Sequence, residues 1–340
     1  MLTTVLFDMG GTLEDIWYNK ETQQEAARKL LEILRDHGLD PGCPQEVFWE
    51  KLFSGVKAYK QWSEGNMLEK KPEEIWPDWY LRDFAFDREQ LLPITEELAN
   101  TYEVTFYHRE LRPDAREMLQ ALKDRGYRLG VISNNASLYN VFNMLEAYGI
   151  RSFMEDVTVS SVTGYRKPHP EIFRISLRQM QARPEECVYV GDTVSRDIIG
   201  PKQVGFAKAV QIRSFLSEQK DVGLSRDVFQ PDTVVRDLRA LVPWLDEIHP
   251  RLAPPPEAST ARSGRLRCGR SAWQRLPGSL EPGSLVLFFE NGSAQQQRSS
   301  ATRQSRSGRL VMIPSAPRAI ISRISASSLT VQVWISIPRS

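Results

Sequence analysis

The chain has 340 residues, of which 41% are hydrophobic and 26% are charged, and its formal net charge is +1. This composition is typical of a globular protein of about two domains, and no apolar run reaches the roughly 18 residues that a membrane helix needs. The N-terminal residues lack the pattern of a signal peptide, and three scattered cysteines form neither a zinc motif nor a disulfide framework. We therefore expect a cytoplasmic protein with no membrane partner.

The first predicted element is an apolar strand over residues 2–8, which ends on a carboxylate, Asp8. Gly10, Gly11 and Thr12 follow it directly. A carboxylate at the end of a buried strand is costly unless it is paired or binds a cation. Free backbone N–H groups after a strand suit an anion. The opening stretch therefore predicts an anion site beside a carboxylate.

A long helical segment comes next. Residues 21–37 show the apolar spacing of a helix, and residues 39–110 continue as a mostly helical, aromatic-rich region. About a hundred residues before Pro113 are far more than an ordinary connection between a strand and a helix needs. We interpret residues 17–108 as an inserted helical domain with hinges near 14–17 and 108–112.

From Pro113 onward, strands and helices alternate. The expected strands are 127–133, 155–160, 187–191 and 207–212, and the expected helices are 113–125, 137–148 and 169–181. This alternation predicts an α/β fold, a doubly wound, Rossmann-like parallel sheet with helices on both faces, formed by residues 1–16 and 109–249. In such sheets ligands bind at the carboxyl ends of the strands.

The last segment, residues 250–340, has a different composition. From residue 251 it contains 13 Arg and 3 Glu with no Lys or Asp, a net charge of +10, whereas the rest of the chain carries −9. A proline-rich linker opens it, and Ser, Arg and Gln follow. We expect a disordered tail, either a native basic segment able to contact nucleic acid or a frameshift-like extension. No nucleic-acid partner is expected for the α/β core.

Polar side chains follow the later strands of the predicted sheet. Asp192 ends one strand, and Asp197 lies five residues beyond it. Carboxylates brought to one sheet edge repel each other, and Mg²⁺ between them removes the repulsion because it prefers oxygen ligands. Ser133 and Asn134 offer hydroxyl and amide groups, and Lys167 adds a positive charge. This pattern indicates a phosphate site with a metal ion and a carboxylate nucleophile.

The stretches FDMGGTL, VISNN, GYRKPHPEIF and VGDTVSRD occur in this order along the chain. Together they resemble the four motifs of the haloacid dehalogenase superfamily over about residues 2–249, and the helical insertion resembles the cap domain of its capped members. The resemblance implies a Mg²⁺-dependent hydrolase, a phosphatase of a small phosphorylated metabolite. It leaves the substrate and the oligomeric state open.

The resemblance also implies roles for single residues. Asp8 matches the nucleophile, Ser133 the residue that binds a phosphoryl oxygen, and Lys167 the lysine that steadies both. The implied phosphate contacts are Gly11, Thr12, Ser133, Asn134 and Lys167. The implied metal ligands are Asp8, the backbone carbonyl of Gly10, Asp192 and Asp197.

The sequence departs from the family pattern at Gly10, where phosphatases of the family have a second Asp that protonates the leaving group. Such acid–base assistance is worth roughly 10²–10⁴-fold. Glu14 and Asp15 are candidates to replace it. One alternative is a phosphonatase-like or other C–X hydrolase, with a Schiff-base lysine among Lys20, Lys51, Lys57 and Lys60. The other is a degenerate domain that binds a phosphorylated ligand without turnover. The intact GDTVSRD motif argues against the metal-free dehalogenase reaction.

Overall fold

The computed structural model of the protein describes residues 1–221, 229–250, 325–326 and 329–330. The chain divides into two compact units, Met1–Ala261 and Arg262–Ser340. In the second unit the described residues form a short antiparallel pair, β9 (Ser325–Ala326) and β10 (Leu329–Thr330). The rest of the tail predicted to be disordered lies outside the described residues. No helix in the described part of the chain is long and apolar enough to cross a membrane.

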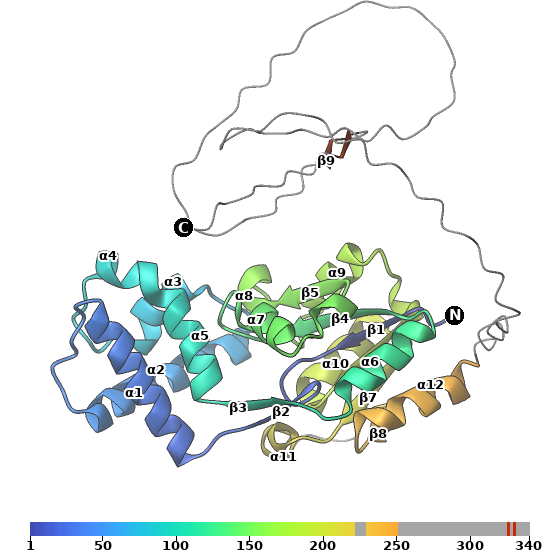
Figure 1. Cartoon of the computed structure of the whole chain (residues 1–340), viewed down its shortest axis with the longest axis horizontal. Helices are drawn as coiled ribbons and strands as arrows, with labels where there is room; N and C mark the ends of the chain where they lie inside the picture. Colours follow the sequence, from blue (N-terminus) through green and yellow to red (C-terminus); the bar gives the residue numbers. More distant parts are fainter. Residues whose placement is uncertain (222–228, 251–324, 327–328, 331–340) are drawn as a thin grey trace, which may run out of the picture. The chain divides into compact units, whose positions relative to one another are not determined.

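A six-stranded parallel sheet forms the centre of the first unit, in the order β5-β4-β1-β6-β7-β8 (Figure 1). Its strands are β1 (Thr4–Phe7), β4 (Arg128–Ser133), β5 (Asp156–Val159), β6 (Cys187–Gly191), β7 (Lys208–Ile212) and β8 (Thr233–Val235). The predicted doubly wound sheet is therefore confirmed. Because β1 lies between β4 and β6, the ends of these three strands meet in the middle of one sheet edge.

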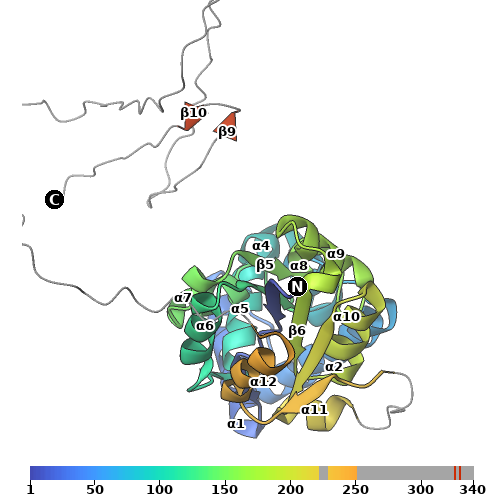
Figure 2. The ribbon, with the colours of Figure 1, turned by 90° about the vertical axis from the view of Figure 1, so that its right-hand side faces the viewer.

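Helices cover both faces of this sheet (Figure 2). One face carries α6 (Ala115–Asp124), α7 (Asn140–Ala147) and α12 (Leu241–Ile248), and the other carries α9 (Pro170–Gln179) and α10 (Ile199–Val204). Successive side chains of β1 point to opposite faces. Val5 and Phe7 pack in the first of these cores, and Leu6 packs in the second with Phe173 and Tyr189. Burial on both faces explains why β1 reads as an uninterrupted apolar run.

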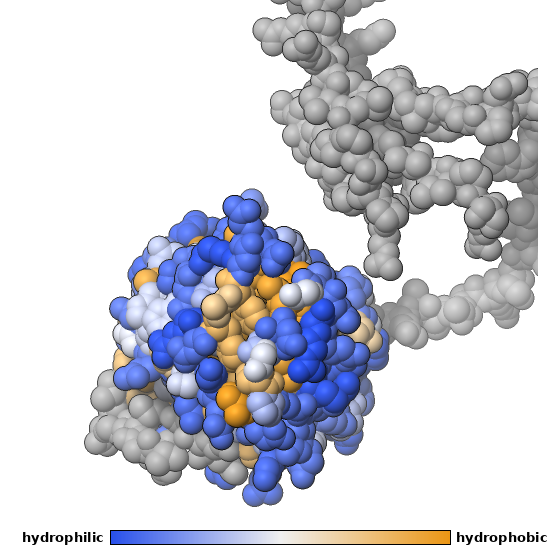
Figure 3. Space-filling view, turned by 90° about the vertical axis from the view of Figure 1, so that its left-hand side faces the viewer, coloured by the Kyte–Doolittle hydropathy of each residue, from blue (hydrophilic) through white to orange (hydrophobic). Residues whose placement is uncertain are grey.

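The inserted segment forms its own helical layer with a separate apolar core. It consists of α1 (Lys20–Asp36), α2 (Gln45–Asn66), α3 (Pro72–Ile75), α4 (Arg88–Leu91) and α5 (Thr95–Thr105), with a π-helical turn at Trp76–Tyr80. We call these the cap helices. Asn19 caps the N-terminus of α1. The buried face of this helix packs Leu30 and Leu34 against the other cap helices. Seen from outside, this end of the molecule is mostly hydrophilic, with an apolar strip through its middle (Figure 3).

Two short antiparallel strands, β2 (Glu14–Trp17) and β3 (His108–Leu111), join the sheet to the cap helices. Residues 108–110 were expected to be helical, and this expectation is wrong. Their strand conformation depends on pairing with β2, which lies more than ninety residues earlier, so the local pattern of charged residues carries little signal for it. Both proposed limits of the cap, residues 17 and 108, fall within this pair.

Candidate active site

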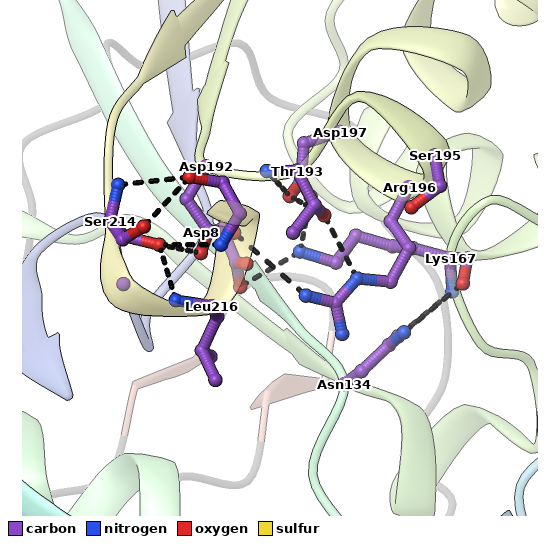
Figure 4. A network of polar contacts seen from close by, with 12 residues as sticks. Asp8, Asn134, Lys167, Asp192, Thr193, Ser195, Arg196, Asp197, Ser214 and Leu216 are labelled. Atoms are coloured by element: carbon purple, nitrogen blue, oxygen red, sulfur yellow. Dashed lines mark hydrogen bonds and ion pairs between the residues drawn. The ribbon is translucent and has the colours of Figure 1, made fainter. Parts of the chain in front are cut away.

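Three buried carboxylates meet at the carboxyl edge of the sheet (Figure 4). Asp8 follows β1, Asp192 follows the neighbouring strand β6, and Asp197 lies in the π-helical turn Val194–Ile198. One oxygen from each carboxylate lies within 4.8 Å of the others. The parallel pairing of β1 and β6 produces this convergence, because it brings the two strand ends to the same edge.

Lys167 supplies the central positive charge of this group. Its Nζ lies 2.8 Å from Asp8 Oδ1 and 2.8 Å from Asp197 Oδ1, and it donates to the Tyr189 hydroxyl at 2.9 Å. The Asn134 side chain fixes the loop that carries this lysine: its Oδ1 accepts from the Lys167 N–H at 2.8 Å, and its Nδ2 donates to the Lys167 carbonyl at 3.1 Å. The end of β4 and the loop before α9 are thereby held together.

Burial and neighbouring charges give the three carboxyls different pKa values. Burial, with the negative charge of Asp197 next, raises the pKa of Asp192 to about 7. Burial also acts to raise the pKa of Asp197, but Lys167 and Arg196 outweigh it and lower that pKa to about 2. Burial raises the pKa of Asp8 against the opposing charge of Lys167. Three carboxyls this close together and this deeply buried are costly to hold in their charged form without further positive charge.

The residues present fit a divalent cation. The charges of Lys167 and Arg196 act on these three carboxyls, which number one more than the two cations. Asp192 Oδ1 is buried and has no hydrogen-bond partner among the described residues, with Arg196 Nη2 3.8 Å away. An oxygen-only donor set of this kind suits a hard cation such as Mg²⁺.

The glycine-rich turn after β1 packs directly against this group. Gly11 has φ +85°, and a Cβ on it would lie 2.2 Å from Asp192 Oδ2, so glycine is required on both counts. The Thr12 N–H donates to the Met9 carbonyl at 3.2 Å, so a phosphate would have to compete with this turn for that amide. Thr12 Oγ1 is buried and has no hydrogen-bond partner within the described ranges.

A pocket of about 440 Å³ lies between the sheet edge and the cap helices. Asp8, Gly10, Ser133 and Asn134 line it from the core, whereas Gly11, Thr12, Lys167, Asp192 and Asp197 lie behind this surface. The cap contributes Lys57, Lys60, Tyr80, Tyr102, Glu103 and Phe106. Asp8 is therefore the one member of the buried carboxylate group that also lines the pocket.

Comparison with known proteins identifies the family. Residues 2–205 match the model of the haloacid dehalogenase-like hydrolases. The chain belongs to this family. It is 27% identical to the glyceraldehyde 3-phosphate phosphatase of Methanopyrus kandleri, over 73% of this chain and 99% of that protein. It is 38% identical to the glyceraldehyde 3-phosphate phosphatase of Pyrococcus furiosus, over 60% of this chain and 78% of that protein.

A solved structure with a similar fold is the 2-haloacid dehalogenase of Pseudomonas syringae pv. Tomato DC3000. Its TM-score is 0.53 and its sequence identity 21%, over 73% of this chain and 100% of that one. At this identity the likeness concerns the fold alone.

Sequence reasoning on this hydrolase missed several residues around the pocket. Arg196 lies inside the VGDTVSRD motif, so that motif carried a signal for it. Ser214 donates to Asp192 Oδ2 at 2.5 Å, and its position as the cap residue of α11 (Phe215–Lys220) gave no hint of this contact. Glu103 and Arg109 also line the pocket, and no motif marks them. Of the four candidate Schiff-base lysines, Lys57 and Lys60 line the pocket.

Proposed function

We propose that the protein is a Mg²⁺-dependent phosphatase of small phosphate monoesters and that Asp8 is its nucleophile. The observation that carries this proposal is the position of Asp8: its carboxylate lines the pocket and is held at 2.8 Å by a fully buried lysine. The phosphatase names of relatives in Methanopyrus and Pyrococcus support the same reaction class.

In the proposed reaction the Asp8 carboxylate bonds to phosphorus and the ester oxygen leaves, which forms an aspartyl phosphate that water then hydrolyses. Lys167 orients the Asp8 oxygen and offsets the negative charge of the phosphoryl group, and Ser133 binds a phosphoryl oxygen at the end of β4. Gly11 and Thr12 are the proposed backbone contacts, and Asn134 holds the Lys167 loop.

A divalent metal ion held by Asp8, Asp192, Asp197 and the Gly10 carbonyl would neutralise charge on the transferred group. Asp192 and Asp197 do not line the pocket, so they would act on the cation, and Asp197 also on Lys167, with no direct contact to substrate. The cap helices close the other side of the pocket and exclude water from the reacting atoms.

The decisive experiment measures turnover of p-nitrophenyl phosphate by the full chain. Asp8→Asn is expected to lower kcat more than about 10³-fold, because it removes the nucleophile and retains the shape of the side chain. Asp83→Asn, an exposed cap position, is the matched control and should keep wild-type turnover. Retained turnover in Asp8→Asn contradicts the proposal.

Metal dependence needs a separate measurement. Treatment with EDTA is expected to abolish turnover, and added Mg²⁺ should restore it, because the three carboxylates repel one another without the cation. Turnover that persists after metal removal contradicts the metal's role and leaves the role of Asp8 standing.

A phosphonatase-like reaction is a second candidate, favoured by the position of Lys57 and Lys60 on the pocket wall. That reaction requires a Schiff base between a lysine and a carbonyl substrate. Borohydride treatment with phosphonoacetaldehyde would trap an adduct on one of these lysines in that case. We expect no adduct, because the proposed phosphatase forms its covalent bond on Asp8.

A further inference from the structure

Gly10 leaves a gap beside Asp8 that other side chains approach. A Cβ on Gly10 would lie 3.5 Å from Arg109 Nη1 and 3.8 Å from Glu14 Oε2, which are ordinary contact distances. The position therefore has room for the first atom of a side chain. The guanidinium of Arg109, from the hinge strand β3, lies immediately beyond it.

Arg109 is almost completely buried between two carboxylates. Its Nη1 lies 2.8 Å from Glu14 Oε2, its Nη2 lies 2.5 Å from Glu103 Oε2, and its Nε donates to the Glu103 carbonyl at 3.0 Å. The three groups come from β2, β3 and the cap helix α5. The single positive charge of Arg109 is thus shared by two buried carboxyl groups, Glu14 from the hinge and Glu103 from the cap.

The two acids of this trio differ in what they can reach. Glu14 is completely buried, and its second oxygen accepts from the Tyr148 hydroxyl at 3.0 Å, so both oxygens are occupied. The other acid expected as a replacement, Asp15, is 55% exposed and lies 3.1 Å from Arg112. Neither lines the pocket, whereas Glu103 does.

The surroundings of Glu103 favour its protonated form. Burial raises the pKa of this carboxyl, and the opposing effect of Arg109 does not cancel it. Arg109 is shared with Glu14, and the nearby Arg166 is paired with Glu69. Asn135 Nδ2 donates a long hydrogen bond of 3.4 Å to Glu103 Oε2. Uncharged tyrosines complete the surroundings, namely Tyr80, Tyr102 and Tyr107.

We propose that Glu103 is the general acid and base of the reaction, supplied by the cap in place of the side chain that Gly10 lacks. This inference rests on the proposed phosphatase function. When the Asp8 oxygen bonds to phosphorus, the bond from phosphorus to the ester oxygen breaks, and that oxygen takes the proton of Glu103 to leave as an alcohol. The Glu103 carboxylate then takes a proton from water as the water oxygen bonds to phosphorus, which releases phosphate and restores Asp8.

The test compares two esters that differ in their need for a proton. p-Nitrophenolate is stable as an anion, whereas the alkoxide of glycerol phosphate requires protonation. Glu103→Gln keeps an oxygen for Arg109 but has no acidic proton to transfer to the leaving oxygen. We expect kcat/KM for glycerol phosphate to fall by about 10²–10⁴-fold, and kcat/KM for p-nitrophenyl phosphate to fall by less than about tenfold. Glu97→Gln, exposed on the same helix, is the control for both esters.

Two further measurements keep the inference testable if Glu103→Gln folds poorly. In the wild type, kcat/KM for glycerol phosphate should fall at high pH as Glu103 loses its proton, and kcat/KM for p-nitrophenyl phosphate should lack this fall. Adding Gly10→Asp to Glu103→Gln should recover at least tenfold of the lost glycerol phosphate activity, because it returns a carboxyl beside Asp8.

The possible outcomes distinguish a failure of the Glu103 proposal from a failure of the proposed phosphatase function. In Glu103→Gln, equal losses on both esters or no loss on either overturn the role of Glu103 and leave the phosphatase standing. So does a wild-type protein that hydrolyses the aryl ester but not glycerol phosphate. Failure of the wild type to hydrolyse either ester removes the phosphatase, and the role of Glu103 with it.

Discussion

The core end of the pocket and its cap end differ in how their charged side chains are held. At the core end, Asp8 and Asp192 follow neighbouring parallel strands, and Lys167 lies between buried carboxylates. At the cap end, Lys57 and Lys60 are exposed on a helix, and Glu103 depends on a guanidinium from the hinge. The core end therefore has a fixed geometry set by the sheet. The cap end depends on how the helices pack against the core.

The largest expected loss of stability comes from a substitution at the core end. Lys167→Met removes the cation between Asp8 and Asp197, and the two buried carboxylates lose their common partner. Removing one side of a buried ion pair costs about 3–5 kcal/mol, so the free energy of unfolding should fall by that amount in urea denaturation. Mg²⁺ should recover part of the loss, because it also neutralises the carboxylates.

Lys29→Met is the control for this substitution, because Lys29 is about half exposed on α1 and contacts a single surface glutamate. It should change the free energy of unfolding by less than about 0.5 kcal/mol. A similar small change for Lys167→Met would show that the core end tolerates unpaired carboxylates, and the contrast between the two ends would be lost.

A smaller effect is expected from the glycine-rich turn that packs against Asp192, a proposed metal ligand. Gly11→Ala imposes a φ of +85° on alanine and places its Cβ against Asp192, and we expect it to cost about 2–3 kcal/mol. Its affinity for Mg²⁺, measured by titration calorimetry, should also fall because Asp192 must move.

Gly205→Ala is the control that measures the backbone strain of a positive φ without any displacement of a neighbouring side chain. Gly205 has φ +93°, and nothing lies within 4 Å of a Cβ there, so its substitution carries the strain alone. It should lower the free energy of unfolding by about 1 kcal/mol and leave Mg²⁺ affinity at the wild-type value. Equal Mg²⁺ affinities in the two variants would contradict the proposed role of Asp192 as a metal ligand.

The smallest effect is expected at the cap end. Glu69, just after α2, contacts Arg166 and the Tyr59 hydroxyl and accepts from Ser160 Oγ at 2.9 Å, which joins the cap to the loop before Lys167. Glu69→Gln removes the charge opposite Arg166 but keeps an oxygen acceptor. We therefore expect a loss of about 1.5 kcal/mol in urea denaturation, at the lower end of the range for hydrogen bonds to charged groups.

The control for Glu69→Gln is Glu50→Gln, at an exposed position on α2. It should leave the free energy of unfolding within about 0.5 kcal/mol of wild type. A loss from Glu69→Gln as large as that from Lys167→Met would mean that the cap is held to the core as firmly as the carboxylates are held to their lysine.

The core end could be predicted in detail from the sequence. Apolar runs that end on Asp8, Ser133 and Asp192, separated by helical segments, are enough to place these side chains at one sheet edge, because parallel strands joined by crossovers expose their carboxyl ends together. The structure places Lys167 and Asp197 in the same group, and their catalytic and metal-binding roles stay predictions.

The trio of Glu14, Glu103 and Arg109 was decided by the tertiary structure alone. Arg109 meets Glu14 across an antiparallel pair whose strands lie more than ninety residues apart, and Glu103 reaches it from a helix whose sequence reads as ordinary amphipathic surface. The end of a strand can be predicted from the local apolar periodicity of the sequence. A contact between a hinge and a cap has no such local signature, because it exists only once the helices have packed on the core.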